Sequence, residues 1–496
     1  MVIATLMTNY GEKMIKKVQF RRTTLIGMFS VAVVLGVASA NFGFFVGSSY
    51  VIGLFLVSLA VIKKRGFLAL LCVLMLGLAI GSWRGANFLR LLNPVNDLYS
   101  KQVILTGIAQ TDGVYSSNSQ LSFDVGQISI SDPIQAQVPG KIKAEGFGIN
   151  AVYRGDKVQV EGKLQDSMGS RVGRVSFATI KVIDHNSSPI ESARHGFNAG
   201  MFSALPEPQA SFGLGLLIGE KTTLPKRVTD NLSTVGLTHI IAVSGYNLTI
   251  IVVAVRRLMS KRSKYQAAMT AVFLIGLFVL MTGFSASIVR AGIVSMLSIA
   301  AWYYGRSVRP ILLIFFTAAL TALWNPLYVW TDAGWYLSFL AFFGVLVLAP
   351  LIANRTKWRR AHSVIGLLMI ESLSAQLMTA PYILFTFKQI SLLALPANIL
   401  VVPLVPIAMF LSLIAGIAGM IITPIAGWFA WPAKIVLTYI LDLAALFARV
   451  PNAVLKRTLS VGGLTMIYGC MVLIILALAR AVANRGTITD SDTGNS

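Results

Sequence analysis

Charged residues are scarce in this sequence. Of its 496 residues 12% are charged and 55% are hydrophobic, and the mean hydropathy is +0.73. A soluble globular domain carries about 25% charged residues. Because the apolar residues form long uncharged runs, the composition excludes an ordinary soluble enzyme and a disordered chain, and it predicts a polytopic membrane protein.

Residues that bind metals or carry out catalysis are also few. The two cysteines, Cys72 and Cys470, both lie inside apolar runs, where packing is commoner than a disulfide, and the four histidines show no metal-binding spacing. G-L-L-I-G-E-K-T-T from Gly215 is similar to a P-loop, but Glu220 separates the last glycine from the lysine. No G-x-S-x-G is present. We therefore expect no metal, no cofactor, no catalytic residue and no enzymatic activity.

Acidic residues are outnumbered, 19 against 42 basic ones, which gives a net charge of +23. Much of the excess lies in short clusters between apolar runs, and such loops mark the cytoplasmic side. The charge therefore predicts a multi-pass protein of the cytoplasmic membrane, in contact with its lipids, with a cytoplasmic N-terminus. The clusters are Lys13–Arg22, Lys63–Arg65, Arg256–Lys264, Arg306–Arg309, Arg355–Arg360 and Arg480–Arg485.

Apolar runs and composition divide the chain into five parts. The runs of spanning length are 23–45, 47–62, 66–82, 237–258, 265–283, 286–305, 310–325, 333–353, 363–387, 391–423, 427–449 and 460–482. They predict an N-terminal cytoplasmic segment with three membrane helices (1–96) and a second membrane bundle (237–482). An amphipathic, interfacial linker (189–236) joins the parts, and a flexible cytoplasmic tail (483–496) ends the chain.

Residues 97–188 differ in kind from the rest of the chain. Five short segments, beginning near residues 103, 120, 141, 157 and 175, alternate apolar and polar side chains between turn residues. Five strands predict a small closed sheet of the OB type, on the extracellular side. Such a barrel either binds single-stranded nucleic acid or has a structural role, in which it only packs or recruits a partner. Nine basic and nine acidic residues leave both alternatives open.

Polar residues within the second bundle are the candidate functional residues. Between 237 and 482 there are three acids, Asp332, Glu371 and Asp442, and Arg290 lies inside an apolar run. Charges at membrane depth usually face a bundle interior or an aqueous cavity. Arg290 paired with Asp332 or Glu371 fits a structural or a functional role equally. His239, Ser244 and Asn247 either join helices by hydrogen bonds or line a path.

The chain resembles the ComEC competence-protein family in several motifs that occur in order. The similar segments are L-L-I-G-E-K-T-T-L-P (216–225), G-L-T-H-I-I-A-V-S-G-Y-N (236–247), F-S-A-S-I-V-R-A (284–291), N-P-L-Y-V-W-T-D-A-G-W-Y-L-S-F-L-A (325–341), A-Q-L-M-T-A-P (375–381) and N-I-L-V-V-P (398–403). The sequence departs from the family at Asn247, where many members have His, and at Trp335 and Tyr336, which replace Phe and Gln.

The resemblance implies a channel that carries single-stranded DNA across the cytoplasmic membrane during natural transformation. It makes Arg290 the candidate phosphate contact and places His239, Ser244 and Asn247 at the outer mouth. Trp335 and Tyr336 are stacking candidates, and we expect Asp332 to orient a cation or to cap a broken helix. The remaining residues that it implies are Lys221, Lys226 and Arg227, as steering charges, and Glu371, Gln376 and Asn398, as polar groups of the bundle.

The resemblance also implies partners. Many members carry a C-terminal metallo-β-lactamase-like domain, and no H-x-H-x-D-H motif is present here. We therefore expect a separate nuclease, together with an outer DNA receptor and a cytoplasmic helicase-like ATPase. Two alternatives remain open. One is a secondary transporter that uses Arg290, Asp332 and Glu371 as an ion relay, and the other is a membrane scaffold that recruits a nuclease.

Overall fold

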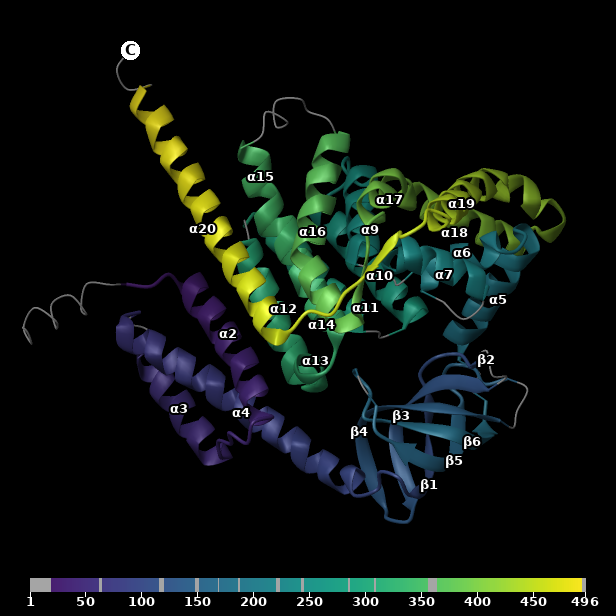
Figure 1. The fold of residues 1–496 in the computed structure, drawn as a ribbon, viewed down its shortest axis with the longest axis horizontal. Coiled ribbons are helices and arrows are strands. Elements are labelled where there is room, and N and C mark those ends of the chain that lie inside the picture. The colour runs from purple at the N-terminus through teal and green to yellow at the C-terminus, as the bar shows by residue number, and fades with distance from the viewer. Residues whose placement is uncertain are drawn as a thin grey trace, which may run out of the picture. The chain divides into compact units, whose positions relative to one another are not determined.

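The chain folds into two compact units, which we describe separately. The computed structural model describes residues 19–61, 65–115, 120–147, 151–167, 169–185, 188–219, 224–241, 245–283, 286–306, 309–355 and 364–492. The first unit takes in residues 1–186 and 306–335, and the second takes in 187–305 and 336–496. Figure 1 shows the elements of both.

Glycines allow two helices of the first unit to pack closely. Gly77, Gly81 and Gly85 recur every fourth residue on α4 (Phe67–Asn96), which lies along α2 (Arg22–Ala40) (Figure 1). A Cβ added to Gly81 would lie 2.2 Å from the Val33 carbonyl oxygen. Small residues at this spacing allow helix backbones to approach each other in a membrane. The unit also contains α3 (Ser48–Val61), α12 (Pro310–Trp324) and α13 (Leu327–Trp330).

The remainder of the first unit is a closed β-barrel. The sheet order β1-β5-β6-β4-β3 closes through a further β1–β3 pairing, and β4 and β6 are the one parallel pair among these strands. The predicted five-stranded, OB-like closed sheet is confirmed, with a two-residue sixth strand at its edge. The strands are β1 (Gln102–Ala109), β2 (Val114–Tyr115), β3 (Leu121–Asp132), β4 (Ala136–Phe147), β5 (Lys157–Gln165) and β6 (Gly173–Asp184).

Helix α4 is continuous with the barrel. Its 30 residues span about 45 Å, which exceeds the roughly 30 Å hydrocarbon core of a bilayer. Phe88, Leu92 and Val95, on its last turns, are buried in the same hydrophobic core as the inward-facing strand residues. The barrel is therefore fixed to the end of a membrane helix through a shared core.

The second unit is helical, and its core lies among α5, α6, α7, α18 and α19. It contains α5 (Pro189–Ala204), α6 (Gln209–Ile218), α7 (Lys226–Val235), α8 (Thr238–Ile241), α9 (Gly245–Leu258), α10 (Lys264–Thr282), α11 (Ala286–Tyr303), α14 (Ala333–Phe343, which begins at the end of the first unit), the π-helix η2 (Gly344–Leu348), α15 (Ala349–Arg355), α16 (Val364–Phe387), β7 (Gln389–Ser391), α17 (Ala394–Val401), the 3₁₀ turns η4 (Val402–Leu404) and η5 (Thr423–Ile425), α18 (Val405–Ile421), α19 (Ala426–Ala448), β8 (Val454–Lys456) and α20 (Val461–Asp492).

The segment 189–236, expected to be an interfacial linker, forms three helices that belong to this core. Every residue of α6 from Ala210 to Ile218 is buried. Gly200 of α5 packs against Gly416 and Gly419 of α18, so closely that a Cβ on Gly419 would lie 1.9 Å from the Gly200 carbonyl oxygen. The helices therefore pack as part of the bundle, and a position of this segment at the membrane surface stays a prediction.

Among the described residues, seven helical segments are long and apolar enough to cross a membrane. Each lies on one of the apolar runs of the sequence, and together they fit a multi-pass membrane protein. Membrane spans at the other five predicted runs, 47–62, 237–258, 286–305, 310–325 and 363–387, stay predictions. The segments are Arg22–Ala40, Phe67–Asn96, Lys264–Thr282, Ala333–Asn354, Ala394–Ile421, Thr423–Ala448 and Val461–Arg480. The cytoplasmic N-terminus and the extracellular position of the barrel stay predictions.

Candidate functional site

The start of α9 packs tightly against two other helices of the second unit. A Cβ on Gly245 would lie 3.3 Å from the Cβ of Ala291 on α11 and 3.3 Å from Cζ of Phe342 on α14. Glycine is the residue that allows this close approach. The packing brings the α9 segment with Asn247 next to the α11 segment with Arg290.

Asn247 connects two segments that lie far apart in the sequence, the start of α9 and the end of α6. Its side chain is buried, and its Nδ2 donates a hydrogen bond to the Leu216 carbonyl at 3.2 Å. Leu216 lies in the last turn of α6, which ends at the left-handed Gly219, so its carbonyl has no partner within the helix. Asn247 therefore supplies a hydrogen-bond donor to a carbonyl at the C-terminus of α6. Its position at an outer mouth stays a prediction.

Arg290 is buried beside an aromatic ring. Its side chain is 2% exposed, and its Cζ lies 5.9 Å from the ring centroid of Phe339 on α14. A guanidinium over a ring face is attracted by the ring quadrupole, more strongly where water is excluded. The ion pair with Asp332 or Glu371 that the sequence suggests stays a prediction.

Aromatic rings continue from Phe339 across to α16. Tyr336 lies one turn before Phe339 on the same face of α14, and its ring centroid is 5.3 Å from that of Tyr382 on α16. The ring of Tyr382 lies 6.3 Å from that of Phe385, one turn further along α16. We call Phe385, Tyr382, Tyr336 and Phe339, with Arg290 at the end, the aromatic row. Ring faces stack with planar groups, and a guanidinium binds anions.

The two helices that carry the rings of the row, α14 and α16, contain unusual backbone. α14 continues into the π-helix η2, where a Cβ on Gly344 would lie 2.6 Å from the Ser374 carbonyl oxygen of α16. π-helical turns often occur at functional sites. α16 contains Pro381, and Tyr468 of α20 donates a hydrogen bond from its hydroxyl to the nearby Met378 carbonyl at 2.9 Å. These contacts fix the helix segments that carry Tyr336 and Tyr382.

Two members of this row, Arg290 and Tyr336, were predicted from the sequence, and the other three were not. The three are Phe339, Tyr382 and Phe385. The spacing Tyr336-x-x-Phe339 and Tyr382-x-x-Phe385 could have shown that each pair shares a helix face. Only the structure could show that the two pairs meet.

The remaining candidates of the second unit lie at several places. His239 is exposed on α8, with its Nδ1 3.1 Å from the Gly236 carbonyl oxygen, and Lys226 and Arg227 are exposed in the first turn of α7. Glu371, Gln376 and Asn398 are partly buried. Within the part of the chain that the structure describes, Gln376 Oε1 and Asn398 Oδ1 are buried without a hydrogen-bond partner. Ser244 and Lys221 lie outside the described residues.

Two candidates of the first unit have well-defined contacts. Asp332 caps α14, because its Oδ1 accepts hydrogen bonds from the backbone N–H groups of Gly334 at 2.8 Å and Trp335 at 3.2 Å. Trp335 is 5% exposed, and its indole N–H donates to Thr321 Oγ1 at 3.0 Å. Its ring is therefore not open for stacking in this conformation, and its role toward DNA stays a prediction.

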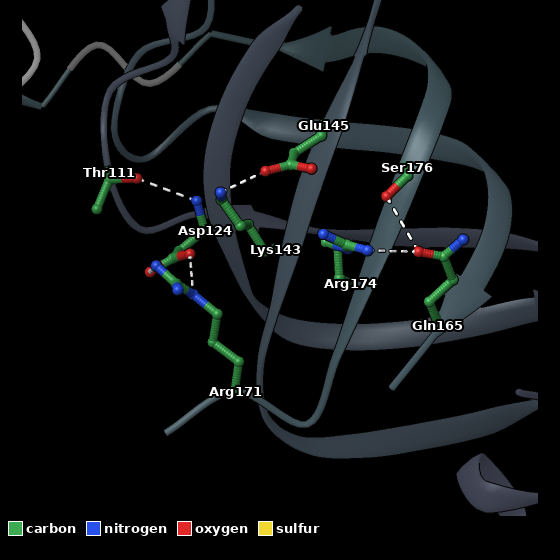
Figure 2. Close-up of polar contacts among 8 residues, drawn as sticks. All are labelled: Thr111, Asp124, Lys143, Glu145, Gln165, Arg171, Arg174 and Ser176. Atoms are coloured by element: carbon green, nitrogen blue, oxygen red, sulfur yellow. Dashed lines mark hydrogen bonds and ion pairs between the residues drawn. The ribbon is translucent and has the colours of Figure 1, made fainter. Parts of the chain in front are cut away.

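The barrel carries a cluster of alternating charges on β3, β4 and β6 and in the loop before β6. Arg171 donates two hydrogen bonds to Asp124, from Nε to Oδ1 at 2.7 Å and from Nη2 to Oδ2 at 3.2 Å. Figure 2 shows Arg171 beside Asp124, and Lys143 paired with Glu145. Burial lowers the pKa of the nearby Lys141 below its ordinary value, while Asp124 raises it. The acids partly neutralise the cations here, so both alternatives for the barrel remain open.

The described residues contain no group of three or more His, Cys, Asp or Glu side chains placed to hold a metal ion. Cys72 and Cys470 are free thiols.

Comparison with known proteins gives the family of the chain. The sequence model of the family described as "Competence protein" matches residues 216–482, more than half of the chain. The chain belongs to the competence protein family. The family match begins at Leu216, whose carbonyl Asn247 binds, and ends in α20, so it contains the complete aromatic row of this competence-family protein.

A curated relative supports the same family. ComE operon protein 3 of Bacillus subtilis (strain 168) is 26% identical over 233 residues, which are 46% of this chain and 29% of the relative. The match thus covers less than a third of that relative's length. No solved structure matches the chain.

Proposed function

We propose that this protein is a conduit that carries single-stranded DNA across the cytoplasmic membrane during DNA uptake in natural transformation. The observation that carries the proposal is the competence-family match over residues 216–482, the region that contains the buried Arg290 and the aromatic row. The region that matches the competence family thus contains a site whose chemistry suits single-stranded DNA.

The chemistry of the row supports this substrate. Single-stranded DNA carries one phosphate charge per nucleotide and one π-face per base, and proteins that bind it without sequence preference combine cations with aromatic platforms. In our proposal Arg290 contacts a phosphate during passage, and Tyr336 and Tyr382 stack with bases. A conduit of this kind binds and positions DNA and breaks no covalent bond.

The direction of transport and the partners are parts of the proposal. In our proposal the N-terminus lies in the cytoplasm and three helices lead to a barrel on the extracellular side, and the basic loops support this orientation. An outer DNA receptor delivers the strand, with Lys221, Lys226 and Arg227 as steering charges. A cytoplasmic helicase-like ATPase pulls it, and a separate nuclease removes the other strand.

Deletion of the gene tests the proposal. We expect fluorescent DNA to remain bound outside the deletion strain, and restored wild-type protein at matched expression to return it to the cytoplasm. The purified protein in vesicles should also pass single-stranded DNA. Unchanged DNA passage in the deletion strain, with uptake of a small solute lost instead, would overturn the conduit and favour the secondary transporter. If the deletion abolishes DNA passage in cells but the purified protein passes no DNA in vesicles, the result would favour the scaffold.

Tyr336 provides a narrower prediction. Tyr336→Phe keeps the ring, so we expect DNA passage within about twofold of wild type. Tyr336→Leu removes the stacking face, and we expect roughly a tenfold loss, because base–aromatic stacking contributes about 1–3 kcal/mol per base. The measurement is the initial rate of fluorescent DNA appearing in the cytoplasm. Equal loss in both variants would show that the hydroxyl, and not the ring, matters.

A further inference from the structure

Two short strands join the ends of two membrane helices in the second unit. β7 follows α16 and β8 precedes α20, and they pair antiparallel with Gln389 opposite Lys456. Beyond this pair the Arg457 N–H donates to the Lys388 carbonyl at 3.1 Å, so Lys388 and Arg457 lie opposite each other at the next position of the ladder. We call residues 388–392 and 453–457 the ribbon.

The charge of the ribbon has one sign. Lys388, Lys456 and Arg457 are exposed on it, and Arg449, also exposed, precedes it. The sequence has no acidic residue in 388–393 or in 449–460. The ribbon therefore carries exposed positive charge, with Lys388 and Arg457 opposite each other and Lys456 on the alternate face of the strand.

The side of the membrane makes this charge unexpected. The basic cluster 355–360 precedes α16, and Arg480 and Arg485 lie toward the other end of α20. Each helix is long enough to cross the bilayer, since the 24 residues of α16 span about 36 Å and Val461–Arg480 is a candidate span. Because the basic clusters mark the cytoplasmic ends of α16 and α20, both predict that the opposite ends, which carry the ribbon, lie on the outer side. The β7–β8 pairing independently requires that the end of α16 and the start of α20 lie on the same side. The positive-inside tendency disfavours basic residues there, so topology does not explain them.

The backbone gives an independent observation. Lys388 ends α16 in the left-handed region, with φ 57°, and its N–H donates to the Leu384 carbonyl at 3.0 Å. Glycine is the usual residue at this position, because a side chain there is strained. Like charges opposite each other across a ladder also destabilise it. A lysine at a position that carries both costs points to a use for its side chain.

We propose that the ribbon is an outer site that binds the phosphates of incoming single-stranded DNA through Lys388, Lys456 and Arg457. The site depends on the proposed function, which supplies this ligand. Each phosphate held by a Lys or Arg releases condensed counterions, so binding at the ribbon is strongly salt-dependent and independent of base sequence.

Binding to the full-length protein in zwitterionic-lipid nanodiscs tests the site. The variant Lys388→Gly, Lys456→Gln, Arg457→Gln is compared with the control Lys261→Gln, Arg262→Gln, Lys264→Gln, which removes the same charge from exposed residues in the α9–α10 loop and at the start of α10. Binding of a fluorescent single-stranded oligonucleotide is titrated at several salt concentrations. We expect the ribbon variant to bind at least about tenfold more weakly and its salt slope to fall by about 2, since each contact contributes about 0.7. The control should stay within about twofold of wild type.

Three outcomes would overturn the site. They are wild-type binding by the ribbon variant, an equal loss in the control, and unchanged DNA binding with lost retention of anionic lipid in nanodiscs that contain it. The last outcome would assign the ribbon to lipid headgroups. The single variant Lys388→Gly should unfold at or above the wild-type temperature while binding DNA more weakly, and a lower temperature would give Lys388 a structural role instead.

The binding measurement is independent of transport. If the gene deletion leaves DNA passage intact, the proposed function fails whatever the nanodiscs show. If the deletion blocks passage and the ribbon variant binds DNA normally, the ribbon site alone fails.

Discussion

Replacement of Gly419 by leucine is expected to prevent the second unit from packing, so that full-length protein fails to accumulate in the membrane. A Cβ at Gly419 would lie 1.9 Å from the carbonyl oxygen and 2.6 Å from the carbonyl carbon of Gly200. Both atoms are backbone of α5, so no side-chain rotation relieves the overlap and α5 must separate from α18. Because overpacking a core typically costs about 1–3 kcal/mol where side chains can adjust, we expect a loss above roughly 3 kcal/mol here.

Gly276→Leu is the matched control for this substitution. Gly276 lies inside α10, where an added Cβ meets nothing within 4 Å. Leucine has a higher helix propensity than glycine, so the control should be neutral or slightly stabilising. Membrane-fraction yield and the unfolding temperature in detergent measure both variants. Normal accumulation of the Gly419 variant would show that α5 and α18 separate without consequence.

Loss of Arg290 is the second large effect that we expect. Arg290→Ala should reduce DNA passage into the cytoplasm by roughly 10- to 100-fold, because hydrogen bonds to charged groups contribute about 1.5–3 kcal/mol. Arg290→Lys keeps a cation beside Phe339 without the planar guanidinium, so passage should be partly restored. The measurement is the amount of fluorescent DNA in the cytoplasm relative to DNA bound outside, at matched expression.

Arg257→Ala is the control, since Arg257 is an exposed arginine on α9. It should leave passage unchanged. Unfolding temperatures of the three variants separate a transport defect from a folding defect. Wild-type passage by the Arg290→Ala variant, in a strain where deletion blocks passage, would remove Arg290 from the DNA path and leave it a packing role.

The local elements could largely be predicted from sequence. Alternation of period two identified the five barrel strands to within a few residues; VILTGIAQ, beginning at Val103, lies within β1 but for its last residue. Long apolar runs identified the membrane helices for a similar reason, since a bilayer of fixed thickness requires about 20 apolar residues. Residues 189–236 were harder, because short helices of mixed polarity occur both at interfaces and inside bundles.

The candidate site could be predicted only in part. Arg290 stood out because a charge within an apolar run is costly, and that cost is readable from sequence. The roles of Asn247 and Trp335 could not be inferred from the sequence, because their hydrogen-bond partners are distant. The partner of Asn247 is Leu216, 31 residues away, and that of Trp335 is Thr321, 14 residues away. A side chain buried by a distant contact has the same sequence pattern as one that lines a path.

The sequence by itself determined that this is a multi-pass membrane protein with a small β-barrel domain, because hydrophobicity and its period act locally along the chain. The tertiary structure decided which residues meet. It closed the barrel through the β1–β3 and parallel β4–β6 pairings, brought Tyr382 to Tyr336, and joined the ends of α16 and α20 in the ribbon. Such contacts depend on close packing between distant segments, where a glycine or a single ring sets the geometry, and no local pattern encodes them.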